Sequence, residues 1–337
     1  MRKRLARAVA AALVAVLIGG AGTESRAQYC RRTPIVEAVQ KTRNGIVTIK
    51  VARPGEAAHR DTVGTGVIVD ERGYVITNCH VVSGAERAVV RLADDTRLEA
   101  RVITLDHPHD LAILKLPAGG PKLQALSFAP ASDLLVGETV IAVGHPFGFT
   151  NTVSTGIISA LGREITMPDG ETLTGLIQTN ASINPGNSGG PMLNINGELI
   201  GINVALREGA QGIAFALNAD VVQQVLARHL SAGKIARLDH GLTCRERVQD
   251  SAAARQQVVI EGVAANSPAE AAGLRRGDFL LKLGDRSVAN RFDVERALWN
   301  CKPGERIEAS ILRDGVPARV SLKLAGVREN WTRAGAR

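Results

Sequence analysis

The sequence predicts a mainly β protein, in which a barrel or sandwich of short strands is followed by a small α+β module. Between residues 46 and 216, short runs rich in Val and Ile alternate with Gly, Asp, Asn and Pro, and few helix-length patterns separate them. Strand-like and helix-like segments alternate after residue 237. The length of 337 residues fits two domains, because domains commonly have about 100–200 residues.

The amino terminus has the pattern of a secretory signal peptide. Cationic residues 1–7 precede an apolar run at residues 8–18, and Ser25 and Ala27 place small residues at the two positions that a signal peptidase reads. The apolar run is shorter than the roughly 20 residues needed to span a bilayer, which favours cleavage after Ala27 over an uncleaved membrane anchor. We therefore expect export, without stable membrane insertion of the mature chain.

Composition and charge argue against several function classes. Residues 1–27 hold five Arg or Lys and one Glu, so their removal lowers the formal net charge from +8 to about +4. The remaining basic residues are scattered, so we expect no nucleic-acid partner. The cysteines are too widely spaced for a zinc-type Cys-x-x-Cys pair, and we expect no metal and no other cofactor. They are Cys30, Cys79, Cys244 and Cys301.

A helix is expected to close the first domain. Val222, Val225 and Leu226 recur at helical spacing, and Asp220 fits the N-cap position. Residues 231–234 then break the helix and predict the linker. In the second module we expect strands at residues 243–248, 257–263, 279–283, 307–313 and 318–324, and helices at residues 267–274 and 292–299.

His80, Asp110 and Ser188 occur in the chain order of the chymotrypsin-type catalytic triad, which subtilisins and α/β-hydrolases do not share. A serine hydroxyl needs a neutral imidazole to take its proton, and a carboxylate orients that imidazole. Each residue alone is more often part of a turn or a strand end. All three, in this order in an exported β-rich chain, predict nucleophilic catalysis.

The glycine-rich segment around Ser188 also predicts an oxyanion hole, formed by residues 186–188. Gly186 has no side chain to obstruct the approach of a substrate, and its N–H and that of Ser188 are positioned to stabilise a tetrahedral intermediate, with Asn187 between them. Loss of one such donor typically costs about 3 kcal/mol of transition-state stabilisation.

These segments resemble the three active-site blocks of the HtrA (DegP/DegQ/DegS-type) serine proteases. The blocks are Thr-Asn-Cys-His-Val-Val at residues 77–82, Asp-Leu-Ala-Ile-Leu at 110–114 and Gly-Asn-Ser-Gly-Gly-Pro at 186–191, and residues 142–148 and 178–186 also look like this family. Residues 267–278 and 301–305 resemble the PDZ domain that these proteases carry. The resemblance implies a signal peptide at 1–27, a chymotrypsin-like double β-barrel at 28–232, a PDZ domain at 237–326 and a tail at 327–337.

The resemblance also implies further sites. Ile183 and Leu206 are the expected wall of an apolar, shallow S1 pocket, which would favour cleavage after Val or Ala. His240, Gly241 and Leu242 form the loop expected to capture a peptide C-terminus, with strand 243–248 and helix 292–299 forming the groove. This loop departs from the family's aromatic-Leu-Gly pattern, so a merely structural module is the alternative.

Other features are also interpreted by resemblance or by chemistry. Cys244 and Cys301 are predicted to form a disulfide, because the binding strand and the groove helix are neighbours in a PDZ fold. Asn180 replaces the family's usual Asp. Cys79 is expected to be a buried or disulfide-bonded cysteine and not a second nucleophile. His107 and His109 are expected to lie in a solvated turn and not in a metal site with Asp110.

Three functions are consistent with these residues. The first is an ATP-independent periplasmic endopeptidase that degrades unfolded or damaged polypeptides, assembled as a homotrimer or a higher oligomer. The second is a regulatory protease that makes one specific cut when a peptide occupies the PDZ groove. The third is a chaperone or peptide-binding protein whose protease domain rests in an inactive state.

Overall fold

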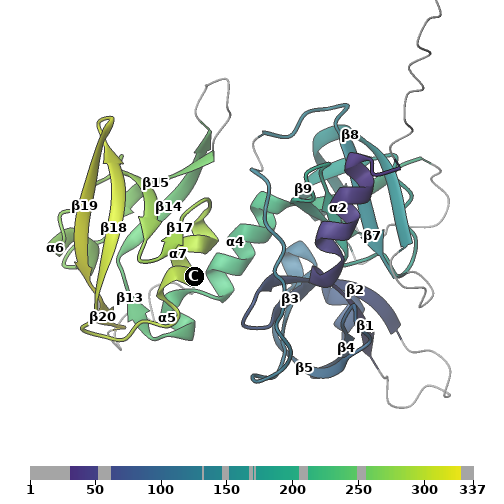
Figure 1. Cartoon of the computed structure of the whole chain (residues 1–337), viewed down its shortest axis with the longest axis horizontal. Helices are drawn as coiled ribbons and strands as arrows, with labels where there is room; N and C mark the ends of the chain where they lie inside the picture. Colours follow the sequence, from purple (N-terminus) through teal and green to yellow (C-terminus); the bar gives the residue numbers. More distant parts are fainter. Residues whose placement is uncertain are drawn as a thin grey trace, which may run out of the picture. The chain divides into compact units, whose positions relative to one another are not determined.

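The computed structural model describes residues 31–51, 62–130, 133–145, 152–166, 170, 172–204, 212–248 and 256–327 (Figure 1). The predicted signal peptide, Cys30, Leu206 and nearly all of the predicted tail lie outside these residues. From Pro34 onward, the described residues cluster as one unit. Within this part of the chain, no helix is both long enough and apolar enough to cross a membrane.

The amino-terminal part of the described chain is a closed antiparallel barrel with the strand order β1-β2-β3-β6-β5-β4 (Figure 1). Helix α2 and the 3-10 turn η1 precede it, the short helix α3 follows β3, and the 3-10 turn η2 follows β5. Its interior is filled by Val, Ile and Leu side chains, as the Val- and Ile-rich runs predict. The elements are α2 (Pro34–Thr42), η1 (Arg43–Gly45), β1 (Ile46–Val51), β2 (Thr62–Asp70), β3 (Tyr74–Thr77), α3 (Cys79–Val82), β4 (Arg87–Arg91), β5 (Arg97–Asp106), η2 (His107–His109) and β6 (Leu111–Lys115).

A second closed barrel has the order β10-β11-β12-β9-β8-β7 and is drawn in teal to green in Figure 1. Strand β11 is buried along its whole length. The two closed barrels confirm the expected chymotrypsin-like architecture. The strands are β7 (Thr139–Gly144), β8 (Thr152–Thr166), β9 (Thr172–Thr179), β10 (Pro191–Leu193), β11 (Leu199–Val204) and β12 (Ala214–Asn218).

Helix α4 (Ala219–His229) directly follows the last strand of the second barrel, at the position where the sequence predicts a helix. The predicted N-cap is wrong, because Asn218 and not Asp220 caps the helix, and the Asn218 side chain accepts a hydrogen bond from the Asp220 N–H. The predicted linker at residues 231–234 is not an open loop. Ser231 caps a second short helix, α5 (Ala232–Ile235).

The carboxy-terminal module is an α+β fold whose main sheet has the order β14-β15-β16-β18-β19, so β14 is an edge strand (Figure 1). Strand β17 pairs with β16, and β13 pairs with β20. Helix α6 is shorter than predicted and ends at Ala271. The elements are β13 (Leu238–Asp239), β14 (Leu242–Val248), β15 (Gln256–Val263), α6 (Pro268–Ala271), β16 (Phe279–Leu283), β17 (Arg286–Ser287), α7 (Arg291–Leu298), β18 (Arg306–Arg313), β19 (Val316–Lys323) and β20 (Ala325–Gly326).

Three aromatic side chains, Tyr74, Phe292 and Trp299, gather where the first barrel contacts α7. The rings of Tyr74 and Trp299 have centroids 5.0 Å apart, and the Arg72 guanidinium lies 4.1 Å from the centre of the Trp299 ring. Nη1 of Arg296 donates to the Val69 carbonyl at 3.0 Å. Stacked rings and cation–π contacts of this kind typically contribute about 0.5–2 kcal/mol each, so these residues connect the peptidase domain to the carboxy-terminal module.

Candidate active site

Asp110 is held in an unusual backbone conformation that turns its carboxylate toward His80. It follows the turn η2 with a left-handed φ of 49°, which Asp tolerates better than most residues. Its carbonyl accepts hydrogen bonds from the Asn78 side chain at 2.9 Å and from the Cys79 N–H at 3.1 Å. These bonds connect the start of β6 to the end of β3, the two places where sequence analysis expects the triad residues.

The Asp110 carboxylate contacts His80 with both oxygens. Oδ2 lies 2.7 Å from Nδ1 of His80, and Oδ1 accepts the His80 N–H at 3.0 Å. With the Nδ1 proton donated to the carboxylate, Nε2 is the ring nitrogen left to act as a base. The contact between Asp110 and His80 thus has the geometry that the acid and the base of a catalytic triad require.

Ser188 is buried in a loop that both barrels hold in place. Its carbonyl accepts the N–H of Thr65 at 3.0 Å, and the Thr65 hydroxyl donates to the Gly186 carbonyl at 2.6 Å. A Cβ on Gly189, which has a φ of 78°, would lie 2.1 Å from the Thr77 hydroxyl. Among the described residues, Ser188 Oγ makes no hydrogen bond to His80, a contact that often tightens only when substrate binds.

The loop presents two backbone donors without protein acceptors. In the described part of the chain, neither the Gly186 N–H nor the Ser188 N–H donates to an acceptor. Asn187, which we expected to belong to the oxyanion hole, differs because its N–H donates to the Asn184 carbonyl at 2.9 Å. Its side chain packs against the end of β7, where a Cβ on Gly144 would lie 2.3 Å from Asn187 Oδ1. Asn187 therefore supports the loop without supplying a backbone donor.

Two positioning residues were missed by sequence analysis. Thr65 lies in β2 of the first barrel, and Asn203 lies in β11 of the second. Asn203 accepts the Gly189 N–H at 3.0 Å and donates its N–H to the Gly190 carbonyl at 2.8 Å and its Nδ2 to the Pro191 carbonyl at 3.0 Å. A polar residue inside an otherwise apolar strand, such as Asn203, is the signal that could have found them.

Comparison with known proteins agrees with this geometry. Residues 64–202 match the trypsin-like peptidase domain, and residues 200–324 match the PDZ domain. The chain belongs to the HtrA-type serine endopeptidases. It is 35% identical over 283 residues to a probable periplasmic serine endoprotease, DegP-like, of Ectopseudomonas mendocina, a match that covers 82% of this chain and 59% of that protein.

Other relatives lead to the same family. Protease Do-like 1, chloroplastic, of Arabidopsis thaliana is 34% identical over 276 residues, which cover 77% of this chain and 63% of that protein. The chain thus spans about 60% of the length of these curated relatives. The serine endoprotease from Yersinia pestis superimposes with a TM-score of 0.51 at 29% identity, covering 88% of this chain and 99% of that one. The HtrA-type protease AlgW with tripeptide has a TM-score of 0.53 at 28% identity, covering 87% and 97%.

The structure describes only one of the two residues expected to line the S1 pocket. Ile183 is partly buried and packs against the apolar cluster that contains Ile177 and Met192. Leu206 lies outside the described residues. The Asn180 side chain, in place of the family's usual Asp, accepts the Ile157 N–H at 2.8 Å and so connects the end of β9 to β8.

The histidines near the triad are structural. Asp106 lies 2.5 Å from Nδ1 of His109 and 2.8 Å from Nε2 of His229, so His109 is paired with a buried carboxylate and is not merely solvated. Burial raises the pKa of Asp106, but hydrogen bonds from the two histidines outweigh this effect and hold it below its ordinary value. Burial, with a smaller contribution from Arg91, lowers the pKa of His145 to about 4. No cluster of three metal-ligating side chains occurs among the described residues.

The cysteines are thiols in the described structure. Cys79 is buried and its Sγ donates to the Leu111 carbonyl at 3.0 Å, so it is not placed as a second nucleophile. The predicted disulfide between Cys244 and Cys301 is absent, since both are free thiols. Cys301 lies beyond the end of α7 and its Sγ faces the Ala297 carbonyl at 3.8 Å, whereas burial raises the pKa of Cys244 to about 12.

Hydrogen bonds to its backbone carbonyls hold the expected peptide-binding loop of the PDZ domain in place. The carbonyls of His240 and Gly241 accept the N–H groups of Ala269 and Ala264, at 3.2 and 2.8 Å. Gly241 has a φ of 72°, and a Cβ there would lie 2.1 Å from the Cβ of Ser267, so only glycine fits. The loop lies beside the start of strand β14, which pairs only with β15 among the described strands.

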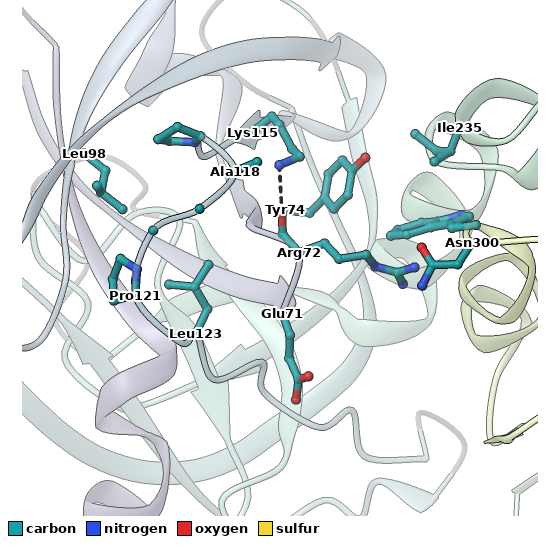
Figure 2. A pocket seen from close by; sticks show the side chains of 14 residues that line it. Glu71, Arg72, Tyr74, Leu98, Lys115, Ala118, Pro121, Leu123, Ile235 and Asn300 are labelled. Carbon is teal, nitrogen blue, oxygen red and sulfur yellow. Dashed lines mark hydrogen bonds between the residues drawn. The ribbon is translucent and has the colours of Figure 1, made fainter.

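A separate pocket of about 410 Å³ lies between the first barrel and the end of α7 and contains no triad residue. Figure 2 shows Tyr74, Arg72 and Asn300 around it, with Nζ of Lys115 donating to the Arg72 carbonyl at 2.7 Å. Burial lowers the pKa of Lys115, with a smaller opposing effect of Asp70. The pocket belongs to the contact between the peptidase and PDZ domains and not to the catalytic site.

Proposed function

We propose that this chain is an ATP-independent periplasmic serine endopeptidase that degrades unfolded or damaged polypeptides. The observation that carries the proposal is the pairing of Asp110 with His80 at 2.7 Å, together with a Ser188 loop in which two backbone N–H groups have no acceptor among the described residues. Relatives named as periplasmic endoproteases support both the reaction and the location. The amino-terminal pattern of residues 1–27 supports export.

In the proposed reaction, Nε2 of His80 takes the proton of Ser188 Oγ as this oxygen attacks the carbonyl carbon of the scissile peptide bond. The carbonyl oxygen becomes an oxyanion that the N–H groups of Gly186 and Ser188 stabilise. The imidazolium then gives its proton to the leaving amine, and an acyl-enzyme remains. Water, activated by the same imidazole, releases the acid and regenerates Ser188.

Substrate preference is proposed from the apolar surroundings of Ile183. With Leu206 as the second wall, a shallow S1 pocket would favour cleavage after Val, Ala or similar residues. We also propose that the PDZ loop at His240, Gly241 and Leu242 binds peptide C-termini, and that the mature chain forms a homotrimer. Mapping of the cleavage sites in an unfolded protein by mass spectrometry tests the preference, and analytical ultracentrifugation tests the oligomer.

The decisive experiment is hydrolysis of denatured casein by the mature chain and by Ser188→Ala. Removal of the nucleophile is expected to lower the rate about 10⁶-fold, to the level of residual binding and oxyanion stabilisation. Circular dichroism checks that the variant is folded. Equal casein hydrolysis by the two proteins would refute the proposed function.

One observation favours a second candidate, a protease domain that rests until a ligand binds. Ser188 Oγ makes no hydrogen bond to His80 among the described residues. A regulatory protease or a peptide-binding chaperone would share this resting state. A fluorophosphonate probe separates the candidates, because labelling of Ser188 without ligand indicates a constitutive protease. Labelling only after a C-terminal peptide is added indicates regulation, and no labelling under any condition indicates a chaperone.

A further inference from the structure

The loop expected to bind peptide C-termini has both of its central amides occupied by its own side chains. The Gly241 N–H donates to Oδ1 of Asp239 at 2.9 Å, and the Leu242 N–H donates to Nδ1 of His240 at 3.0 Å. A PDZ domain captures a terminal carboxylate on backbone amides of this loop. A peptide carboxylate must therefore replace these side chains before it can bind.

The contact between Leu242 and His240 requires one particular protonation state of the imidazole. A ring nitrogen accepts a hydrogen bond only when it carries no proton, so Nδ1 is bare and Nε2 carries the proton. Nε2 lies 3.3 Å from Oε1 of Glu295 on α7, and Oε2 of the same carboxylate accepts the Ala232 N–H at 2.6 Å. Glu295 thus holds the ring in the orientation that covers the Leu242 amide.

The surroundings of this loop fit a carboxylate attached to an apolar chain. The loop lines a cavity of about 420 Å³, to which Lys234 and Arg237 contribute positive charge and Leu238 and Ala264 contribute apolar surface. Strand β14 begins here and is an edge strand, so its outer side can pair with an added strand. The ligand chemistry is therefore that of an extended peptide with a free C-terminus.

We propose that His240 is a proton-operated latch on the PDZ domain, which covers the Leu242 amide when neutral and releases it when protonated. Once Nδ1 gains a proton it can no longer accept the Leu242 N–H, and it becomes a second donor for the incoming carboxylate. Peptide binding then takes up one proton. The latch rests on the proposed binding of peptide C-termini and adds its regulation by pH.

The charges around His240 set the pH range of the latch. Glu295 faces the ring from α7, Asp239 from the preceding strand β13, and Lys234 and Arg237 line the same cavity. Burial lowers the pKa of His240, but the two carboxylates outweigh it and raise this pKa above its ordinary value. The peptide carboxylate raises it further. Affinity is therefore expected to rise as pH falls through the neutral range, which lies near and above the ordinary histidine value.

The pH dependence can be assigned to one residue, since His240 is the only histidine in residues 237–326. The test uses the full mature chain with Ser188→Ala, which prevents cleavage, and an N-acetylated, histidine-free octapeptide that ends in Val and carries tetramethylrhodamine. Fluorescence anisotropy gives the Kd from pH 5.5 to 8.5. We expect tightening of up to about tenfold for each pH unit over which binding takes up a proton, and negligible binding of the C-terminally amidated peptide.

Two variants isolate the latch. His240→Gln keeps a carbonyl oxygen that can accept the Leu242 N–H but cannot gain a proton in this range, so its Kd is expected to be independent of pH. His229→Gln, which changes a histidine of α4 outside the PDZ domain, is the matched control and is expected to keep the wild-type pH dependence. Isothermal titration calorimetry in phosphate and in Tris buffer gives the number of protons taken up, with a value near one expected around neutral pH.

The outcomes distinguish the latch from the function on which it rests. Peptide binding with the same Kd at pH 6 and pH 8, or a pH dependence that persists in His240→Gln, would overturn the latch and leave C-terminal peptide binding in place. Binding of neither peptide at any pH would overturn both peptide binding and the latch. The casein assay is unaffected by either result and reports on the proposed peptidase alone.

Discussion

The catalytic loop at residues 186–190 and the PDZ loop at residues 239–242 have related expected roles, but their backbone amides have different hydrogen-bond partners. Each is expected to direct backbone N–H groups at a negatively charged oxygen. In the catalytic loop, the N–H groups of Gly186 and Ser188 have no acceptor among the described residues. In the PDZ loop, side chains of the loop accept the corresponding hydrogen bonds of Gly241 and Leu242. Among the described residues, the first loop therefore leaves both amides free to donate to an anion, whereas the second must first release its own side chains.

The difference concerns the groups that bond the amides of each loop. The catalytic loop is held by residues distant in the chain, Thr65 of β2 and Asn203 of β11, through its carbonyls and through the Gly189 N–H. Its oxyanion donors are not needed for support. The PDZ loop is also held through its carbonyls, but the neighbouring side chains of Asp239 and His240 accept hydrogen bonds from its amides. The two loops therefore differ in the groups that bond their amides, since both are held by distant residues through their carbonyls.

The largest expected effect in this comparison concerns the orientation of His80 by Asp110. Asp110→Asn removes the carboxylate that fixes the Nδ1 proton of His80, so the imidazole adopts the wrong tautomer and kcat for casein is expected to fall about 10⁴-fold. Peptide binding to the PDZ domain is expected to stay unchanged. A loss of less than about tenfold would show that Asp110 does not orient the base.

A pair of glycine substitutions separates the two loops. Gly189→Ala places a Cβ 2.3 Å from the Thr65 carbonyl in a backbone conformation that L residues rarely adopt. The displaced loop is expected to lower kcat at least about 10²-fold, because small misplacements of reacting groups cost that much. Gly241→Ala, which would contact Ser267, is the matched change in the other loop.

The expected results of this pair are opposite. Gly241→Ala is expected to weaken binding of the free-carboxylate peptide by more than about tenfold and to leave casein hydrolysis intact. Gly189→Ala is expected to leave peptide binding intact. If Gly241→Ala abolished casein hydrolysis while the protein stayed folded by circular dichroism, the two loops would not be independent, and the comparison between them would fail.

The role of Thr65 in holding the catalytic loop is tested by Thr65→Val, which keeps the shape of the side chain but removes its hydroxyl. This hydroxyl donates to the Gly186 carbonyl at 2.6 Å and accepts the His145 N–H at 3.0 Å. Loss of order in the oxyanion hole is expected to reduce kcat by about 10- to 100-fold with little change in KM. The variant Thr65→Ser, which retains the hydroxyl, is the control and is expected to remain within about threefold of wild type. Equal losses in the two variants would exclude a role of the hydroxyl.

The smallest expected effect concerns the hydrogen bond from the Gly241 N–H to Asp239 in the PDZ loop. Asp239→Ala removes the acceptor of the Gly241 N–H and leaves this amide open for a carboxylate. Because a hydrogen bond contributes about 0.5–1.5 kcal/mol net, peptide affinity is expected to rise about 2- to 10-fold. Fluorescence anisotropy at pH 7 measures the change. A weaker affinity would mean that Asp239 supports the loop and does not compete with the ligand.

Sequence analysis predicts the barrel fold and the triad because both leave local patterns. Short runs of Val and Ile mark barrel strands, and the order His80, Asp110, Ser188 restricts the fold. Asn203 leaves only the signal of a polar residue in an apolar strand. The contacts of Thr65 and Asn203 with the catalytic loop could not be predicted, since they join residues more than ten positions apart and depend on how the strands register. The N-cap at Asn218 was missed because Asn218 and Asp220 are both good caps two residues apart.

The predictions for the carboxy-terminal module fail where side-chain direction decides. The expected disulfide assumed that neighbouring elements bring their cysteines together, but Cys301 lies beyond the end of α7 with its thiol turned back toward Ala297. Likewise, peptide binding by residues 240–242 stays a prediction, and the sequence does not indicate that Asp239 and His240 cover the amides of this loop. Rotamers set by tertiary contacts, not by spacing, determine both outcomes.

The contact of Thr65 with the Ser188 loop makes the conformation of this loop depend on the folding of both barrels. The loop of Ser188 belongs to the second barrel, but Thr65 and Thr77, which it contacts, belong to the first. The loop therefore reaches this conformation only when both barrels have folded and docked. Any reaction that needs this loop is thus expected only from the completely folded chain, and a partly folded chain is expected not to cleave itself or its neighbours.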